Sequence, residues 1–169
     1  MNDMTELTGK KAPAFKAAVI GGSYGEGDTV SLADLKGQTV VLYFYPKDDT
    51  PGCTAQACAL RDGWSRIQKR AAVFGVSVDP LNSHAKFIKK HSLPFPLISD
   101  EAKEMVQAYG VWVEKSMYGK KFMGTERSTV IIGAVAMHFK VGDPFKKCVP
   151  ALSVLVLCLI IIAGHWPGR

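Results

Sequence analysis

The sequence predicts an α/β domain in which strands and helices alternate along the chain. Apolar and β-branched runs at residues 40–45, 72–78 and 128–132 have the length of strands. Helical patterns occupy the intervals between these runs, and no linker divides the first 132 residues. This alternation favours a sheet built with right-handed crossovers and covered by helices.

The first core strand is predicted at residues 40–45, where the run VVLYFY stops at Pro46. A helix is predicted next, because Thr50 suits an N-cap and Pro51 suits the first helical turn. We expect this helix over residues 53–70. Its face toward the sheet is then formed by apolar residues at steps of three and four, namely Cys53, Ala57, Leu60, Trp64, Ile67 and Ala71.

The other elements follow the same alternation. They are a hairpin within residues 1–39, a strand at 72–78, a helix from Asn82 or Ser83 to about His91, a helix capped by Ser99 and Asp100 that runs to Tyr109, and a strand at 128–132. Residues 1–132 are therefore expected to form one domain, and residues 133–169 a divergent tail.

Composition excludes several classes of protein. The 169 residues are 47% hydrophobic and 21% charged, which is typical of one globular domain rather than a disordered or repetitive chain. The net charge of +6 is spread along the chain, since residues 1–132 and residues 133–169 each contribute +3. We therefore expect no nucleic-acid partner.

The chain contains four cysteines and begins without an apolar secretory segment, so we expect a cytoplasmic protein. In a reducing compartment, a pair such as Cys53 and Cys58 more often performs redox or metal chemistry than holds a fold together. Zinc is not expected, because no histidine flanks the pair and the histidines at 84, 91 and 138 are scattered. The adjacent carboxylates of Asp48 and Asp49 give no evidence for acid–base catalysis.

Cys53 is the first residue to consider for chemistry. It lies in the first turn of the predicted helix, where free backbone N–H groups and the helix dipole favour an anion, so its thiol should ionise readily. The alternative is a buried structural cysteine at the start of an apolar stripe. The loop before it ends a buried strand, a place where α/β proteins build ligand sites.

Two segments, YFYPKDDTPGCTAQAC and YGVWVEKSMYGKKFMGTERSTVII, resemble peroxiredoxins of the bacterioferritin comigratory protein, or peroxiredoxin Q, type. The resemblance extends from about Gly9 to Ile132. It implies a thioredoxin-like fold, with a central mixed sheet flanked by helices, and the reduction of hydrogen peroxide and organic hydroperoxides. The implied site residues are Cys53 as peroxidatic nucleophile, Thr50 hydrogen-bonded to thiolate and peroxide, Pro46 as a shield from water, and Arg127, which completes the pocket.

The resemblance also implies that Cys58 resolves the sulfenic acid of Cys53, that thioredoxin recycles the disulfide, that no cofactor or metal is needed, and that the protein is a monomer. Five residues of α-helix rise about 7.5 Å, more than the roughly 7 Å between Cα atoms that a disulfide can bridge. We therefore expect the first turns of the Cys53 helix to unwind during turnover. Alternatively, Cys58 is a small core residue and an external thiol resolves Cys53.

After Ile132 the resemblance stops. Residues 134–141 are expected to form an edge strand, but the apolar run that follows has no helical periodicity. A shifted reading frame, a tail anchor at residues 149–164 and a replacement helix each account for this segment. The tail anchor is short, at about 24 Å against a hydrocarbon core of roughly 30 Å. No role is assigned to Cys148 or Cys158.

Two other functions remain open at this point. A general thiol–disulfide oxidoreductase would share the fold, but ordinarily uses a Cys-x-x-Cys motif that this chain lacks. An inactive or membrane-attached relative would follow from a disrupted carboxyl-terminal region. We further expect Trp112, Tyr118 and Phe122 to pack beside the active site as part of its wall.

Overall fold

The computed structural model describes residues 11–133 and 138–141. Among the strands in these residues, seven form one sheet in the order β2-β1-β5-β4-β3-β8-β9, and β6 and β7 form a separate pair. The strands are β1 Lys16–Ile20, β2 Thr29–Ser31, β3 Val40–Phe44, β4 Ala72–Ser77, β5 Leu97–Ser99, β6 Trp112–Met117, β7 Lys120–Thr125, β8 Ser128–Ile132 and β9 His138–Val141. The helices are α1 Pro51–Asp62, α2 Trp64–Ile67, α3 Leu81–His91 and α4 Glu104–Ala108.

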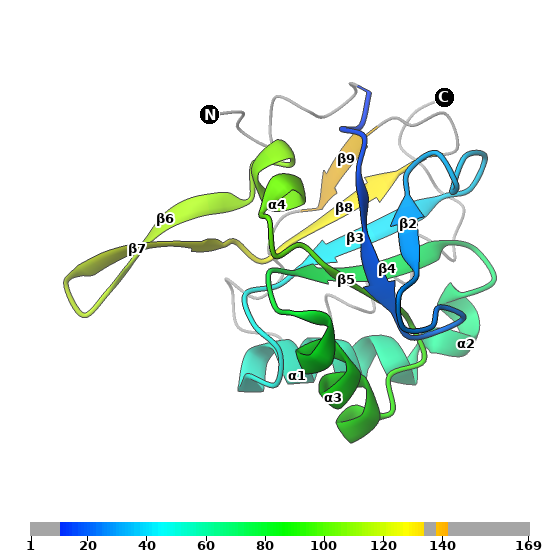
Figure 1. Ribbon diagram of the computed structural model, residues 1–169, viewed down its shortest axis with the longest axis horizontal. Helices are drawn as coiled ribbons and strands as arrows, with labels where there is room; N and C mark the ends of the chain where they lie inside the picture. Colours follow the sequence, from blue (N-terminus) through cyan, green and yellow to red (C-terminus); the bar gives the residue numbers. More distant parts are fainter. Residues whose placement is uncertain (1–10, 134–137, 142–169) are drawn as a thin grey trace.

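The centre of the sheet is parallel and its margins are antiparallel. β3, β4 and β5 run in parallel, whereas β8 pairs with β3, and β1 pairs with β5, in the antiparallel sense. All five residues of β3 are buried, and its side chains alternate between two cores. One core lies beneath α4, and the other lies beneath α1, α2 and α3 (Figure 1). The predicted α/β class is confirmed.

The predicted helix over residues 53–70 is wrong in its extent, because it is interrupted at Gly63. The Gly63 N–H group bonds to the carbonyls of Ala59 and Arg61 and closes α1, and α2 begins at the next residue. Glycine has poor helix propensity, which accounts for the interruption. The apolar stripe nevertheless continues across it, since Leu60 and Ile67 enter the same core.

Two helix starts also differ from those predicted. α3 begins at Leu81 after Pro80, whose fixed φ of −73° suits the cap position, so neither Asn82 nor Ser83 is the N-cap. α4 spans only five residues, because Ser99 belongs to β5 and a turn precedes the helix. Asp100 still stabilises the amino-terminal turn of α4, since its Oδ2 accepts a hydrogen bond from the Val106 N–H.

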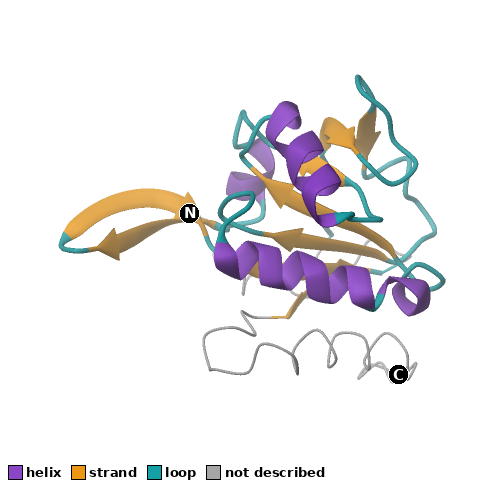
Figure 2. Ribbon diagram, turned by 90° about the horizontal axis from the view of Figure 1, so that it is seen from below, coloured by secondary structure: helices purple, strands orange, loops and turns teal. Residues whose placement is uncertain are grey.

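Strands β6 and β7 form an arm that projects from the body of the protein (Figures 1 and 2). Tyr118 and Gly119 turn the chain at its tip, with positive φ angles of 50° and 77°. Tyr118 is 98% exposed and Phe122 is 43% exposed. The expectation that these two side chains form a wall of the active site is therefore wrong: the strands pair with each other instead of covering the sheet. Only Trp112, at the base of the arm, packs against the core.

The predicted edge strand within residues 134–141 is confirmed by β9, which pairs with β8. The questions raised about the tail, including its reading frame, the apolar run at 149–164 and the cysteines at 148 and 158, fall outside the described residues. Among the helices that the structure describes, none is long and apolar enough to cross a membrane.

Candidate active site

Cys53 lies where the central strand passes into the first turn of a helix. β3 ends at Phe44, the chain crosses a loop at residues 46–50, and Thr50 is the N-cap of α1. The Cys53 side chain faces the sheet with Ala57 and Leu60, so the residue is only 2% exposed. The site thus places a thiol at the end of the sheet in surroundings that exclude most water.

Arg127 reaches the sulfur from the neighbouring strand. It directly precedes β8, and the β3–β8 register pairs Phe44 with Ser128, so Arg127 lies beside the beginning of the loop. Its Nη2 donates a hydrogen bond to Cys53 Sγ at 3.2 Å. A Cβ atom on Gly52 would lie 3.4 Å from this nitrogen, so a glycine at this position leaves room for the guanidinium. The structure therefore brings together Cys53 and Arg127, as the sequence predicted.

Gln56 is a site residue that the sequence reasoning missed. It is 4% exposed, and its Oε1 accepts a hydrogen bond from Nη1 of Arg127. A polar residue beside the apolar stripe of α1 was the available signal, because a buried amide needs a partner. One guanidinium thus contacts both Cys53 and Gln56, one turn apart on the helix.

Thr50 and Pro46 lie in the loop that precedes the helix, and both are partly buried. The Thr50 hydroxyl donates to the Lys47 carbonyl at 3.1 Å, which fixes the side chain within the loop. The predicted hydrogen bond from Thr50 to the sulfur is not among those recorded for the described residues. The shielding role of Pro46 stays a prediction, and so does the contact of Thr50 with a peroxide.

Cys58 lies on the same helix but on a different side. Both thiols are free, and Cys58 is partly exposed, whereas Cys53 is buried. Helix geometry separates the two positions by about 140° around the axis and about 7.5 Å along it. Beyond Cys58, Arg61 Nη1 donates to the His91 carbonyl at 2.8 Å and attaches this half of α1 to α3.

A buried polar network lies behind the loop. Asp48 accepts hydrogen bonds from the Tyr45 hydroxyl at 2.7 Å and the Ser83 hydroxyl at 2.7 Å, and its Oδ2 lies 2.8 Å from His84 Nδ1. Burial alone would raise the pKa of Asp48, but the hydrogen bonds from His84, Tyr45 and Ser83 outweigh it and hold this pKa below its usual value. Asp48 and His84 were not predicted to act together.

Tyr43 lies in the same core as Cys53, and its hydroxyl has no hydrogen-bond partner within the described part of the chain. Burial raises its pKa well above the usual value, and the nearby Asp48 and Cys53 add to the effect. The hydroxyl therefore stays protonated as a neutral group in the core beside the thiol.

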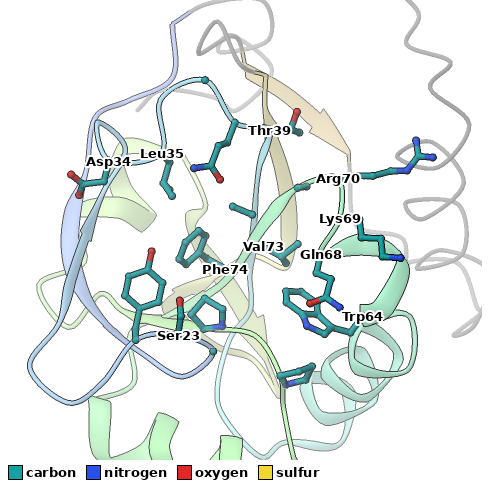
Figure 3. A pocket seen from close by; sticks show the side chains of 18 residues that line it. Ser23, Asp34, Leu35, Thr39, Trp64, Gln68, Lys69, Arg70, Val73 and Phe74 are labelled. Atoms are coloured by element: carbon teal, nitrogen blue, oxygen red, sulfur yellow. The ribbon is translucent and has the colours of Figure 1, made fainter.

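No group of three potential metal ligands occurs among residues 11–133 and 138–141. A cavity of about 930 Å³ opens at the opposite end of β3 and β4, lined by Thr39, Trp64, Val73 and Phe74 among others (Figure 3). None of the five predicted site residues lines it. The chemistry suggested by the sequence is thus confined to the end of the sheet that carries Cys53.

Comparison with known proteins agrees with this arrangement. Residues 8–136 match the AhpC/TSA family. The chain is 47% identical over 130 residues to Peroxiredoxin Bcp of Bacillus subtilis, covering 76% of this chain and 80% of that protein. It is 43% identical over 122 residues to Peroxiredoxin Bcp of Escherichia coli, covering 72% of this chain and 78% of that protein.

Solved structures show the same fold. The bacterioferritin comigratory protein of Xanthomonas campestris, described for its alkyl peroxide reduction activity, superposes with a TM-score of 0.75 at 29% identity, covering 90% of this chain and 91% of that chain. Peroxidoxin BcpB of Mycobacterium tuberculosis gives a TM-score of 0.76 at 27% identity, covering 94% and 98%. The predicted thioredoxin-like fold is confirmed.

Proposed function

The chain belongs to the AhpC/TSA family, as one of its Bcp or peroxiredoxin Q peroxiredoxins, and from this premise we propose how its residues reduce peroxides. It is a thiol-dependent peroxidase. The observation that carries the proposed mechanism is the 3.2 Å hydrogen bond from Arg127 to the buried Cys53 sulfur.

In the first step, the Cys53 thiolate attacks one oxygen of a hydroperoxide. The S–O bond forms as the O–O bond breaks, and Cys53 becomes a sulfenic acid. The other oxygen leaves with the bonding electron pair and takes a proton from solvent, equivalent to the one that the thiol released on ionising, to give water or an alcohol. Arg127 carries a fixed positive charge in surroundings that exclude most water, so it stabilises the thiolate and the charge that moves onto the leaving oxygen. Thr50 and Pro46 orient the peroxide and exclude water.

In the second step, Cys58 condenses with the sulfenic acid, which forms the Cys53–Cys58 disulfide and releases water. Because α1 contains both cysteines and an intact helix holds them too far apart, its first turns unwind before the bond forms. A dithiol reductant, thioredoxin, then exchanges with the disulfide and restores both thiols.

We also propose the compartment and the oligomeric state in which this cycle takes place. A disulfide that must be reduced in every turnover suits a reducing compartment, so the enzyme works in the cytoplasm. Each step uses residues of one chain, so a monomer suffices. Sedimentation of the reduced and oxidised protein tests the monomer directly.

The test is consumption of hydrogen peroxide and of an alkyl hydroperoxide, with thioredoxin, thioredoxin reductase and NADPH as the reducing system. Cys53→Ser removes all consumption, whereas Cys58→Ser allows one oxidation of Cys53 and no thioredoxin-driven turnover. Full thioredoxin-driven turnover by the Cys58→Ser protein would refute the resolving role of Cys58. Undiminished consumption by Cys53→Ser would refute the mechanism as a whole.

A further inference from the structure

Two consecutive aspartates of the loop each bind a histidine of α3. Asp48 pairs with His84 in the interior, and Asp49 pairs with His91 at the surface. We propose that the inner pair, Asp48 and His84, are positioning residues for the peroxide step: they fix the loop of residues 46–50 that presents Thr50 and Cys53 to the substrate. This inference rests on the proposed role of Cys53.

The inner pair is almost fully enclosed. The side chain of His84 is 0% exposed and that of Asp48 is 4% exposed. His84 Nε2 lies 3.1 Å from the Ile98 carbonyl oxygen, and Nδ1 lies 2.8 Å from Asp48 Oδ2. The ring therefore connects β5 to the loop.

Hydrogen-bond geometry shows how this pair is attached to its neighbours. A carbonyl oxygen only accepts, so Nε2 of His84 donates to Ile98. Asp48 already accepts from the hydroxyls of Tyr45 and Ser83, and its Oδ2 lies 2.8 Å from Nδ1 of His84 as well. Asp48 and His84 are thus hydrogen-bonded to each other in the interior, and removing one partner leaves a polar atom of the other buried without that hydrogen bond.

The backbone of the loop is attached at the same place. The Asp48 N–H donates to Asp79 Oδ2 at 2.9 Å, and the Ser77 hydroxyl donates to the same oxygen at 2.8 Å. Both the main chain and the side chain of Asp48 are therefore bound to the end of β4 and to α3. Thr50 follows two residues later, so its position depends on how Asp48 is attached.

The outer pair has the same topology but lies at the surface, where the His91 side chain is 18% exposed. The Asp49 side chain is 43% exposed and contacts Lys90 Nζ at 2.6 Å and His91 Nε2 at 2.9 Å. Exposed ion pairs contribute little, because water screens them and long side chains lose entropy. Asp49 and His91 therefore provide matched controls on the same loop and the same helix.

The peroxide step is the part of the cycle that depends on this placement. Attack requires the sulfur, the guanidinium and the entering oxygen atoms to be aligned, and a displacement of about 1 Å costs up to roughly 100-fold in rate. The later steps begin by unwinding α1, which releases Cys53 from that alignment. Loosening the loop should thus slow oxidation of Cys53 and spare the reduction that follows.

The experiment measures steady-state turnover of hydrogen peroxide at saturating thioredoxin in Asp48→Asn and His84→Asn, with Asp49→Asn and His91→Asn as controls. When reduction limits kcat, a slower peroxide step appears as a higher KM for peroxide. We expect KM to rise about 10-fold or more in the inner-pair variants. We expect kcat to stay within about twofold, and both constants to stay within about twofold in the controls.

Two results would overturn the inference. One is an unchanged KM in both inner-pair variants, whether or not kcat falls, and the other is an equal rise of KM in Asp49→Asn. Tyr109→Phe removes a buried hydrogen bond to the Pro13 carbonyl in the opposite core and controls for lost stability, so its KM should not change.

Ser83→Ala keeps the inference testable if the inner-pair variants fail to fold, because it removes one hydrogen bond to Asp48 and leaves the contact between Asp48 and His84 intact. It should raise KM by about threefold, and an unchanged KM in this variant would count against the inference. Failure of the proposed function has a different signature: the unmodified chain would consume no peroxide, or Cys53→Ser would remain active.

Discussion

Gln56 and Arg127 lie 71 residues apart in the sequence and share a hydrogen bond in the interior. The guanidinium that donates to the Gln56 amide also donates to the Cys53 sulfur. Residues three apart on a helix lie on one face, so the planar fork of an arginine can contact both. Gln56 thus orients the Arg127 guanidinium toward the Cys53 sulfur.

Replacing Gln56 with alanine should slow oxidation of Cys53 by about 10-fold, because Arg127 loses the partner that orients it. Stopped-flow measurement of the second-order rate constant with hydrogen peroxide provides the test. Thr54→Ala, in the same turn, serves as the control and should react at the normal rate. A normal rate constant for Gln56→Ala would mean that other contacts suffice to hold Arg127.

Arg127→Lys should reduce the same rate constant by about 100-fold although the charge is kept. A lysine ammonium lacks the planar fork and cannot contact the sulfur and the Gln56 amide in the same two directions. The measurement is again stopped-flow oxidation, with unfolding in urea to establish that the variant is folded. A loss of less than about threefold would show that charge alone is sufficient.

Oxidation should remove hydrogen-exchange protection from the amides of residues 53–58, because the disulfide forms only after these turns unwind. Amides of β3 should keep their protection in both states, since all five residues of this strand are buried in the sheet. Cys58→Ser treated with one equivalent of peroxide is the control and should stay protected. Equal protection of residues 53–58 in reduced and oxidised protein would exclude the unwinding.

Gly75→Ala should destabilise the fold by about 1–3 kcal/mol, because an added methyl group overfills the core. A Cβ atom at Gly75 would lie 2.6 Å from Leu97 Cδ2 and 2.6 Å from the Tyr43 hydroxyl. Urea unfolding gives the free energy. Gly25→Ala is the matched control, since its nearest neighbour would be the Asp28 carboxylate at 3.8 Å. A similar loss in both variants would contradict the packing explanation, because only Gly75 has core atoms where the methyl group would lie.

Asp48 should make stability depend on pH in the acid range. Its pKa in the folded protein is below the usual value, because hydrogen bonds from His84, Tyr45 and Ser83 outweigh the opposing effect of burial. A carboxyl group of this kind stabilises the fold above its unfolded pKa of about 3.9, and the contribution is lost as the pH falls through the folded value.

The advantage of the unmodified chain over Asp48→Asn in free energy of unfolding should therefore be largest near neutral pH. It should shrink steadily below about pH 4. Urea titrations at a series of pH values measure this difference. Asp49→Asn should show a smaller change, because Asp49 is exposed and screened by water. An advantage that grows on acidification would contradict the lowered pKa of Asp48.

The core strands and the position of Cys53 at a helix start could be predicted from the sequence, because each is marked by residues close together in the chain. The apolar runs of β3, β4 and β8 are long enough to identify buried strands, and the order Thr50, Pro51, Cys53 marks a helix start. The arm formed by β6 and β7 was missed because its exposed residues carry no apolar alternation.

Contacts between residues far apart in the sequence could not be predicted from local sequence patterns. His84 looked like one of several scattered histidines, and its pairing with Asp48 depends on α3 packing beside the loop. Gln56 was hidden for the same reason, since its partner Arg127 lies directly before β8 and far from Gln56 in the sequence. In both cases a polar side chain on a buried face was the signal, and the identity of its partner required the fold.

The interruption at Gly63 limits how far a helix opening can spread. α2 has its own place in the core, where Ile67 is buried and the Trp64 ring lies 5.6 Å from that of Phe95. Helical cooperativity passes through consecutive hydrogen bonds, so an opening that starts at the front of α1 meets a natural boundary there. An opening of α1 is therefore confined to its 12 residues, about three turns of helix, while α2 and the hydrophobic interior around it stay closed to solvent.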